Sequence, residues 1–121
     1  AFLPGTEGLG ARRPDEDAGQ LVRRLRALLE FLPDAGFFRH RLGVWLVETG
    51  AHADAEPHLR AGLAAGFDDA PSWGVLGMSL RGQARYREAA EAFARAAALD
   101  PGEPRHGAFM NECLALAQRG R

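Results

Sequence analysis

The most constraining feature of this sequence is that it repeats itself at a fixed period. When the chain is shifted by 34 residues, apolar and small residues fall on one another in two separate stretches. The matching pairs are Leu42 with Leu76, Gly43 with Gly77, Leu46 with Leu80, Ala55 with Ala89, and Leu59 with Phe93. Agreement of two stretches at one period is typical of stacked supersecondary units, each too small to bury its apolar face alone.

The spacing of apolar residues predicts that the units are helical. In the first apolar stretch, Leu21, Leu25, Leu28 and Leu32 recur with the period of one helix face. We expect this helix to begin near Asp15, which can cap it, and to end at Pro33. The same reading over the whole chain predicts an all-α fold of five to six helices in antiparallel pairs, without strands.

The segment 70–103 carries a recognisable motif. It reads Trp73-x-x-Leu76-Gly77, followed by Leu80, Tyr86, Ala89, Phe93, Ala96 and Leu99-Asp100-Pro101. This pattern resembles the tetratricopeptide repeat (TPR), a helix-turn-helix unit of the same length. Residues 36–69 form a weaker copy, which has Gly62 where alanine is usual and Phe67 where proline is usual. Residues 15–35 match only the second helix of a unit and 104–121 only the first.

The resemblance implies a TPR domain over residues 15–121, preceded by a flexible arm over residues 1–14. Gly43 and Gly77 would allow the two helices of a pair to approach closely, and Leu59 and Phe93 would fill the space between pairs. We expect the second helix of the first unit to begin at Ala55, capped by Asp54, with Pro57 in its first turn.

In TPR proteins the first helices of successive units line a concave groove that binds a peptide or helix. Carried over by position, the lining residues are Phe37, His40, Val44 and Val47, then Pro71, Gly74, Met78 and Arg81, then Arg105, Ala108, Glu112 and Ala115. Most are apolar, so we expect a protein partner with apolar anchors, and an acidic group of that partner could pair with Arg81 or Arg105. The Lys-based carboxylate clamp of some eukaryotic TPR domains is missing, because the chain has no lysine.

The same residues have a structural alternative. Phe37, Val44 and Val47 could instead pack against the helix that precedes them, since most apolar residues at helical spacing belong to a core. Trp45 could pack there as well, or serve as a binding hot spot.

A second, narrower resemblance covers about a dozen residues. Glu103-Pro104-Arg105, Ala108 and Glu112-Cys113-Leu114 look like the third unit of type III secretion chaperones, small TPR proteins that hold translocator proteins in their groove. The chain departs from that pattern at Asn111, where a small residue is expected, and ends before the second helix of the unit. A chaperone-like function is therefore a sub-hypothesis.

Composition argues against several other function classes. The formal net charge is -1, and the arginine-rich stretches are not interleaved with aromatic residues, so we expect no nucleic-acid binding. The apolar runs are too short to span a membrane. The four histidines and Cys113 do not have the spacing of a metal or catalytic site, so we expect no enzyme, metal or cofactor. With one cysteine and no signal peptide, we expect a cytoplasmic protein. We also expect the interaction module to be bacterial.

A different functional class also fits the sequence. The chain does not begin with Met, so it could be the structural spacer or oligomerisation arm of a larger protein. On the last half-unit, Leu114 and Leu116 would expose apolar surface unless something covers them. We therefore expect either a further helix or self-association through the C-terminal helix.

Overall fold

The computed structural model describes residues 15–31 and 36–120, and these fold into six α-helices. In chain order the helices are α1 (Ala18–Phe31), α2 (Gly36–Glu48), α3 (His52–Ala64), α4 (Ala70–Gly82), α5 (Tyr86–Leu99) and α6 (Pro104–Arg119). The described residues contain no strand. The predicted all-α fold with five to six helices is therefore confirmed, whereas the predicted arm over 1–14 lies outside the described residues.

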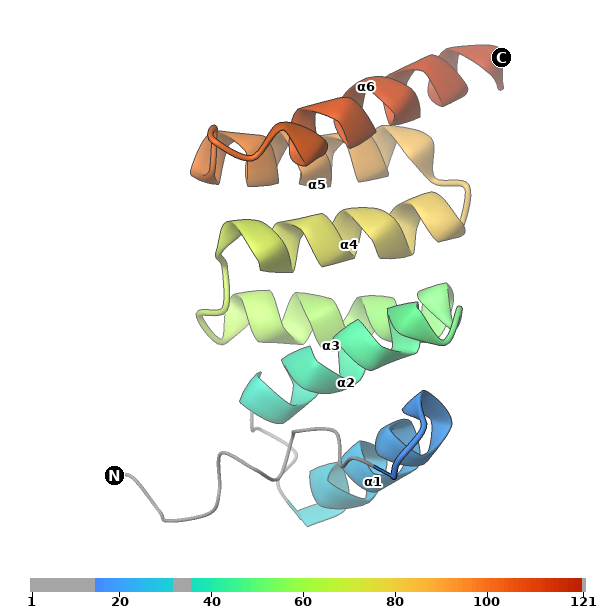
Figure 1. The fold of residues 1–121 in the computed structure, drawn as a ribbon, viewed down its shortest axis with the longest axis vertical. Helices are drawn as coiled ribbons and strands as arrows, with labels where there is room; N and C mark the ends of the chain where they lie inside the picture. Colours follow the sequence, from blue (N-terminus) through green and yellow to red (C-terminus); the bar gives the residue numbers. More distant parts are fainter. Residues whose placement is uncertain (1–14, 32–35, 121) are drawn as a thin grey trace.

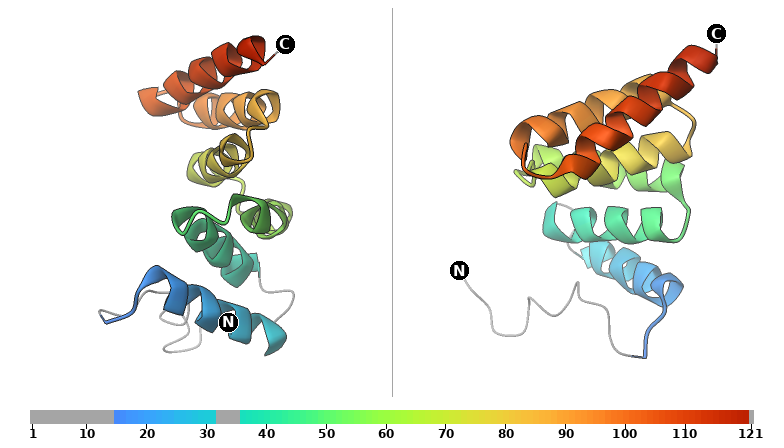
Figure 2. Two further views of the ribbon diagram at one scale, coloured as in Figure 1. Left: turned by 90° about the vertical axis from the view of Figure 1, so that its right-hand side faces the viewer. Right: turned by 45° about the horizontal axis from the view of Figure 1, so that its top comes forward.

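The helices stack along the long axis of the molecule in chain order, with α1 at one end and α6 at the other (Figure 1). Each helix packs mainly on its neighbours in sequence, and α2 also contacts α4. Figure 2 shows the pairs α2–α3 and α4–α5 in successive layers, with α6 lying over α5. Because neighbouring helices are joined by short turns, each pair is antiparallel.

The interior of each pair is built on the glycines that the repeat predicts. A Cβ atom on Gly43 would lie 2.6 Å from Leu59 Cδ2, and one on Gly77 would lie 2.8 Å from Phe93 Cε1. Neither side chain could stay in place, so glycine lets the large residue of the second helix lie directly on the first. Leu59 and Phe93 are each 1% exposed, which places this contact at the centre of the core.

The first helix begins later than predicted. The backbone N–H of Gln20 donates to Asp17 Oδ1 at 2.7 Å, and the backbone N–H of Asp17 donates to Gln20 Oε1 at 2.9 Å. This reciprocal pair is a capping box, which needs Glu or Gln three residues after the cap. Asp15 has Ala18 at that position, so the prediction that Asp15 caps the helix is wrong. Pro33, predicted to end it, lies outside the described residues.

The second helix of the first unit begins earlier than predicted. It starts at His52 after Ala51, which makes no side-chain cap, and Asp54 lies within its first turn. The predicted start at Ala55 with Asp54 as cap is therefore wrong. The Ser79 hydroxyl of α4 donates to the His52 carbonyl oxygen at 2.6 Å. This contact between units holds the start of α3 in place. The residues around His52 contain no local signal from which the contact could be predicted.

Candidate groove on the first helices

The predicted lining positions lie on α2 and α4, the first helices of the two complete units, and on α6, the first helix of the last half-unit. The structure brings Pro71, Gly74 and Met78 of α4 together with Arg105 of α6 around one groove. The α2 positions do not line this groove. The predicted surface therefore divides into an α4–α6 part, which is hollowed, and an α2 part, which lies further along the stack.

The hollowed part, which we call the α4–α6 groove, has a volume of about 310 Å³. Its lining residues are Pro71, Gly74, Val75, Met78, Phe93, Asp100, Glu103, Arg105, His106 and Phe109. Apolar side chains form the walls and floor, and the charged ones gather around the turn between α5 and α6. A site of this kind suits an apolar anchor with polar groups at one end.

Two stacked aromatic rings contribute to the α4–α6 groove. The ring centroids of Phe93 and Phe109 lie 5.2 Å apart, with planes inclined at 24°. Gly74 also lines the groove and leaves room for the His106 ring, because a Cβ atom at this position would lie only 3.0 Å from His106 Cε1. Position-by-position transfer from the family missed Phe109, although it falls on Val75 in the 34-residue repeat and both residues line the groove.

Arg105 is already paired within the chain. Its Nε donates to Glu103 Oε1 at 2.9 Å, and its backbone N–H donates to the same oxygen at 3.1 Å. The pKa of the Glu103 carboxyl is lowered, mainly by these side-chain and backbone hydrogen bonds. Glu103 also caps α6, so the charged end of the groove is tied to the start of that helix.

Arg81 is also paired. Its Nη2 donates to Glu112 Oε1 at 2.5 Å, which links α4 to α6. The guanidinium carbon lies 5.6 Å from the centroid of the Phe109 ring, a cation–π distance. An acidic group of a partner would have to compete with Glu112 for Arg81 and with Glu103 for Arg105, so neither arginine is a vacant carboxylate site.

On α2, the predicted residues differ widely in exposure. Phe37 is 40% exposed, and its ring lies 6.3 Å from Phe67 and 5.4 Å from Phe38. The His40 ring instead stacks on Phe67 at 5.6 Å, with planes only 9° apart. Burial lowers the pKa of His40, and the nearby Asp69 charge partly opposes this shift. Phe37 therefore offers surface, whereas much of His40 is used in packing.

Val44, Val47 and Trp45 are half-buried and pack against the core. The Arg41 guanidinium lies 5.8 Å from the centroid of the Trp45 ring. On α6, Ala108 and Ala115 are exposed. The predicted positions thus include packed residues on α2 and exposed residues on α6. Only those that line the α4–α6 groove form a concave surface.

The described residues contain no cluster of three or more histidine, cysteine, aspartate or glutamate side chains able to hold a metal ion. Cys113 is buried, and burial raises the pKa of its thiol. Within the part of the chain that is described, no helix has the length and apolar character needed to cross a membrane.

Comparison with solved structures identifies the architecture. Three structures of MamA, a TPR-like protein, superimpose on 84% to 85% of this chain. MamA 41-end from Desulfovibrio magneticus RS-1 has a TM-score of 0.72 at 22% identity, and a MamA mutant has a TM-score of 0.78 at 23% identity. The chain has a TPR fold. No family model and no curated protein matches it.

This TPR fold accounts for the positions of the groove residues, because its first helices share one side of the stack. The chain spans 65% of a MamA RS-1 double mutant, 68% of MamA 41-end and 59% of the other mutant. At these identities the likeness concerns the fold alone. What the groove binds has to be argued from its own residues.

Proposed function

We propose that this chain is a non-catalytic protein-interaction module that holds a partner segment along the first helices of its TPR fold. The observation that carries the proposal is the α4–α6 groove, with an apolar wall from Val75 and Met78 and stacked rings from Phe93 and Phe109. A groove of about 310 Å³ accommodates one or two large side chains of a peptide or helix.

The charges around the groove favour an apolar anchor over an acidic one. Arg105 is held by Glu103 and Arg81 by Glu112, so burying a partner carboxylate requires breaking an existing ion pair. An apolar side chain enters without that loss and covers the half-buried ring of Phe109. Phe37, which is 40% exposed on α2, would extend the contact along the stack.

A chaperone role is the finer form of this proposal. A groove with an aromatic floor could shield an apolar segment of a client protein, as in the secretion chaperones that residues 103–114 resemble. We place this activity in a bacterial cytoplasm, which agrees with the single cysteine, Cys113. The spacer or oligomerisation arm is the second candidate, and the exposed apolar face of α6 favours the oligomerisation form of it.

The proposal is tested by selecting binders from a displayed library of peptides and measuring their affinities for groove variants. We expect Met78→Glu to weaken the selected peptides by at least about tenfold, because a charge would be buried against the aromatic floor. Ala98→Glu, at an exposed position on α5, is the charge-matched control and should leave affinity unchanged. Circular dichroism verifies that both variants keep their helical content. If the peptides bind Met78→Glu as tightly as wild type, the groove is not the binding site.

A further inference from the structure

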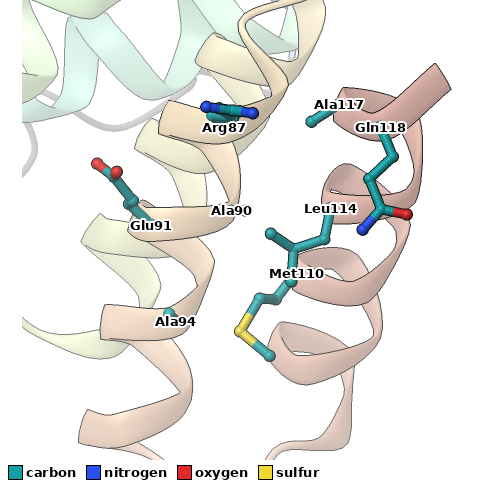
Figure 3. Close-up of a pocket in the computed structure, with 8 residues that line it drawn as sticks. All are labelled: Arg87, Ala90, Glu91, Ala94, Met110, Leu114, Ala117 and Gln118. Carbon is teal, nitrogen blue, oxygen red and sulfur yellow. The ribbon is translucent and has the colours of Figure 1, made fainter. Parts of the chain in front are cut away.

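A second groove lies between α5 and α6, and it is separate from the α4–α6 groove. Its volume is about 500 Å³. Figure 3 shows Met110, Leu114 and Ala117 of α6 pointing toward Ala90 and Ala94 of α5. Arg87, Glu91 and Gln118 complete its lining. Leu114 is 44% exposed, which is unusual for the central apolar residue of a helix.

The repeat shows what normally covers this face. Met110 and Leu114 fall on Leu76 and Leu80 of α4, which are each 1% exposed because α4 is covered on this side by α5. The same face of α2 is covered by α3. A helix lying over α6 would therefore continue the stacking interface that runs through the chain.

Asn111 restricts which helix can lie there. It stands at the position of Gly43 and Gly77, over which Leu59 and Phe93 pack in the two complete units. The Asn111 side chain prevents a large residue from making the same approach. A covering helix must therefore face Asn111 with a small residue or with a group that hydrogen-bonds to its amide.

The outer face of α6 meets this requirement itself. Gly107, Ala108, Asn111, Leu114, Ala115 and Gln118 lie on one face of α6 centred on Asn111, and none of them is charged. A Cβ atom on Gly107 would meet nothing within 4 Å, so that position is open. Around a two-fold axis at Asn111, antiparallel copies of α6 would place Leu114 against the small Ala108 of the other copy. The two Asn111 amides could then donate to and accept from each other.

Charge complementarity selects the same arrangement. The exposed Arg119 lies eight residues after Asn111 and Glu103 lies eight residues before it. In the antiparallel register each Arg119 therefore approaches Glu103 of the other copy, once at either end of the contact, and would share that carboxylate with Arg105. A parallel pairing would instead place Arg119 beside Arg119, and like charges oppose association.

We propose that this face of α6 docks against α6 of a second copy of the chain, antiparallel, with the two-fold axis beside Asn111. The contact is formed by Gly107, Ala108, Asn111 and Leu114 and closed at its ends by Arg119 and Glu103. Only Glu103 of these residues also lines the α4–α6 groove, so the contact and the function proposed for that groove can be tested separately.

The oligomeric state is the first test. Sedimentation equilibrium from nanomolar to high micromolar protein should show a wild-type dimer. Leu114→Asp should weaken the dimer by on the order of 100-fold, because the two-fold axis repeats the substitution. Leu99→Asp is the matched control, since Leu99 is 51% exposed on α5 and should leave the dimer intact. A monomeric wild type, or a Leu114→Asp variant as dimeric as wild type, overturns the proposal and leaves the face to another protein's helix.

Disulfide trapping tests the register and does not require Leu114 to be changed. In a Cys113→Ala background, Asn111→Cys places two thiols at the axis and should give a covalent dimer under mild oxidation. Gln118→Cys should not, because antiparallel copies hold those residues about 20 Å apart along the helix axis. Trapping through Gln118→Cys, or an absence of trapping through Asn111→Cys, overturns the antiparallel register. The Leu114→Asp variant should still bind the selected peptides in the α4–α6 groove. Loss of the dimer with unchanged peptide binding therefore separates the fate of this proposal from that of the proposed function.

Discussion

The two complete units share one plan but differ at three positions that act together. The first unit has His40, Gly62 and Phe67 where the second has Gly74, Ala96 and Pro101. A Cβ atom on Gly62 would lie 3.0 Å from His40 Cβ and 3.4 Å from His40 Cα, and the His40 ring stacks on Phe67 at 5.6 Å. The departures from the family pattern at Gly62 and Phe67 are therefore the accommodation of one histidine.

In the second unit the same space is arranged differently. Gly74 has no side chain to place against α5, so Ala96 can replace glycine and is fully buried. The room beside Gly74 is taken by His106 from the following helix. One unit thus fills the space with its own residue and the other with a residue of its neighbour, which also leaves the α4–α6 groove beside Gly74.

The largest expected effect concerns the large residue that packs on a glycine in each of the two units. Phe93→Ala should lower the free energy of unfolding by about 4 kcal/mol, and Leu59→Ala by about 3 kcal/mol, because each leaves a cavity over a glycine. Urea denaturation followed by circular dichroism gives both values. Leu99→Ala, at a residue that is 51% exposed, is the control and should change stability little. Equal small losses at Phe93 and Leu59 would show that the glycine contacts do not carry the core.

A smaller effect tests whether His40 and Gly62 are coupled. Gly62→Ala should destabilise the protein by about 1 kcal/mol, since overpacking against the His40 backbone outweighs the gain in helix propensity. In a His40→Gly background, which imitates the second unit, the same substitution should instead stabilise by about 1 kcal/mol. The difference is the coupling energy of a double-mutant cycle measured by urea denaturation. Additive effects would contradict the coupling.

The repeat made the fold predictable because packing constraints recur at a fixed period. Glycine against leucine or phenylalanine is a local rule, and it placed the pairs correctly at Gly43 and Gly77. The start of α3 was not predictable, because it depends on the Ser79–His52 hydrogen bond between units. Asp54 is a residue type that caps helices, so the sequence predicted that α3 begins after it, whereas α3 begins at His52.

The candidate site was predictable in outline only. The family pattern placed Met78 and Arg105 on the groove side, because position in the unit fixes which side of the stack a residue occupies. It could not show that Arg81 pairs with Glu112, since that contact joins side chains on two helices through their rotamers. It also omitted Phe109, whose role depends on stacking with Phe93.

The pH dependence of stability should separate the two units again. Burial lowers the pKa of both His40 and His58, and Arg39 and Arg26 lower that of His58 further. The unfolded chain therefore binds more protons than the folded one near and below the ordinary histidine pKa, so stability is greatest above it and falls as pH drops from about 7 to 5.

Hydrogen exchange resolves where this loss occurs. The second unit, residues 70–103, contains no histidine, so amides of α2 and α3 should lose more protection on acidification than those of α4 and α5. His40→Gln together with His58→Gln should flatten the profile in this range. A loss of protection shared evenly by both units, or unchanged in the double variant, would assign the acid sensitivity to other groups.

The smallest expected effect concerns the turns within the two pairs. Gly50 and Ala84 occupy the same repeat position, and both have positive φ angles, 86° and 59°. An alanine in this left-handed region is strained by about 1 kcal/mol or more, whereas glycine is not, although glycine gains more freedom when the chain unfolds. Ala84→Gly should therefore stabilise the protein by about 0.5 kcal/mol, and Gly50→Ala should destabilise it by about 1 kcal/mol. A Cβ atom on Gly50 would meet nothing within 4 Å, so that loss reports backbone strain without a steric clash. Shifts of the urea midpoint at constant slope measure both effects, and a destabilising Ala84→Gly would mean that the two turns are not equivalent.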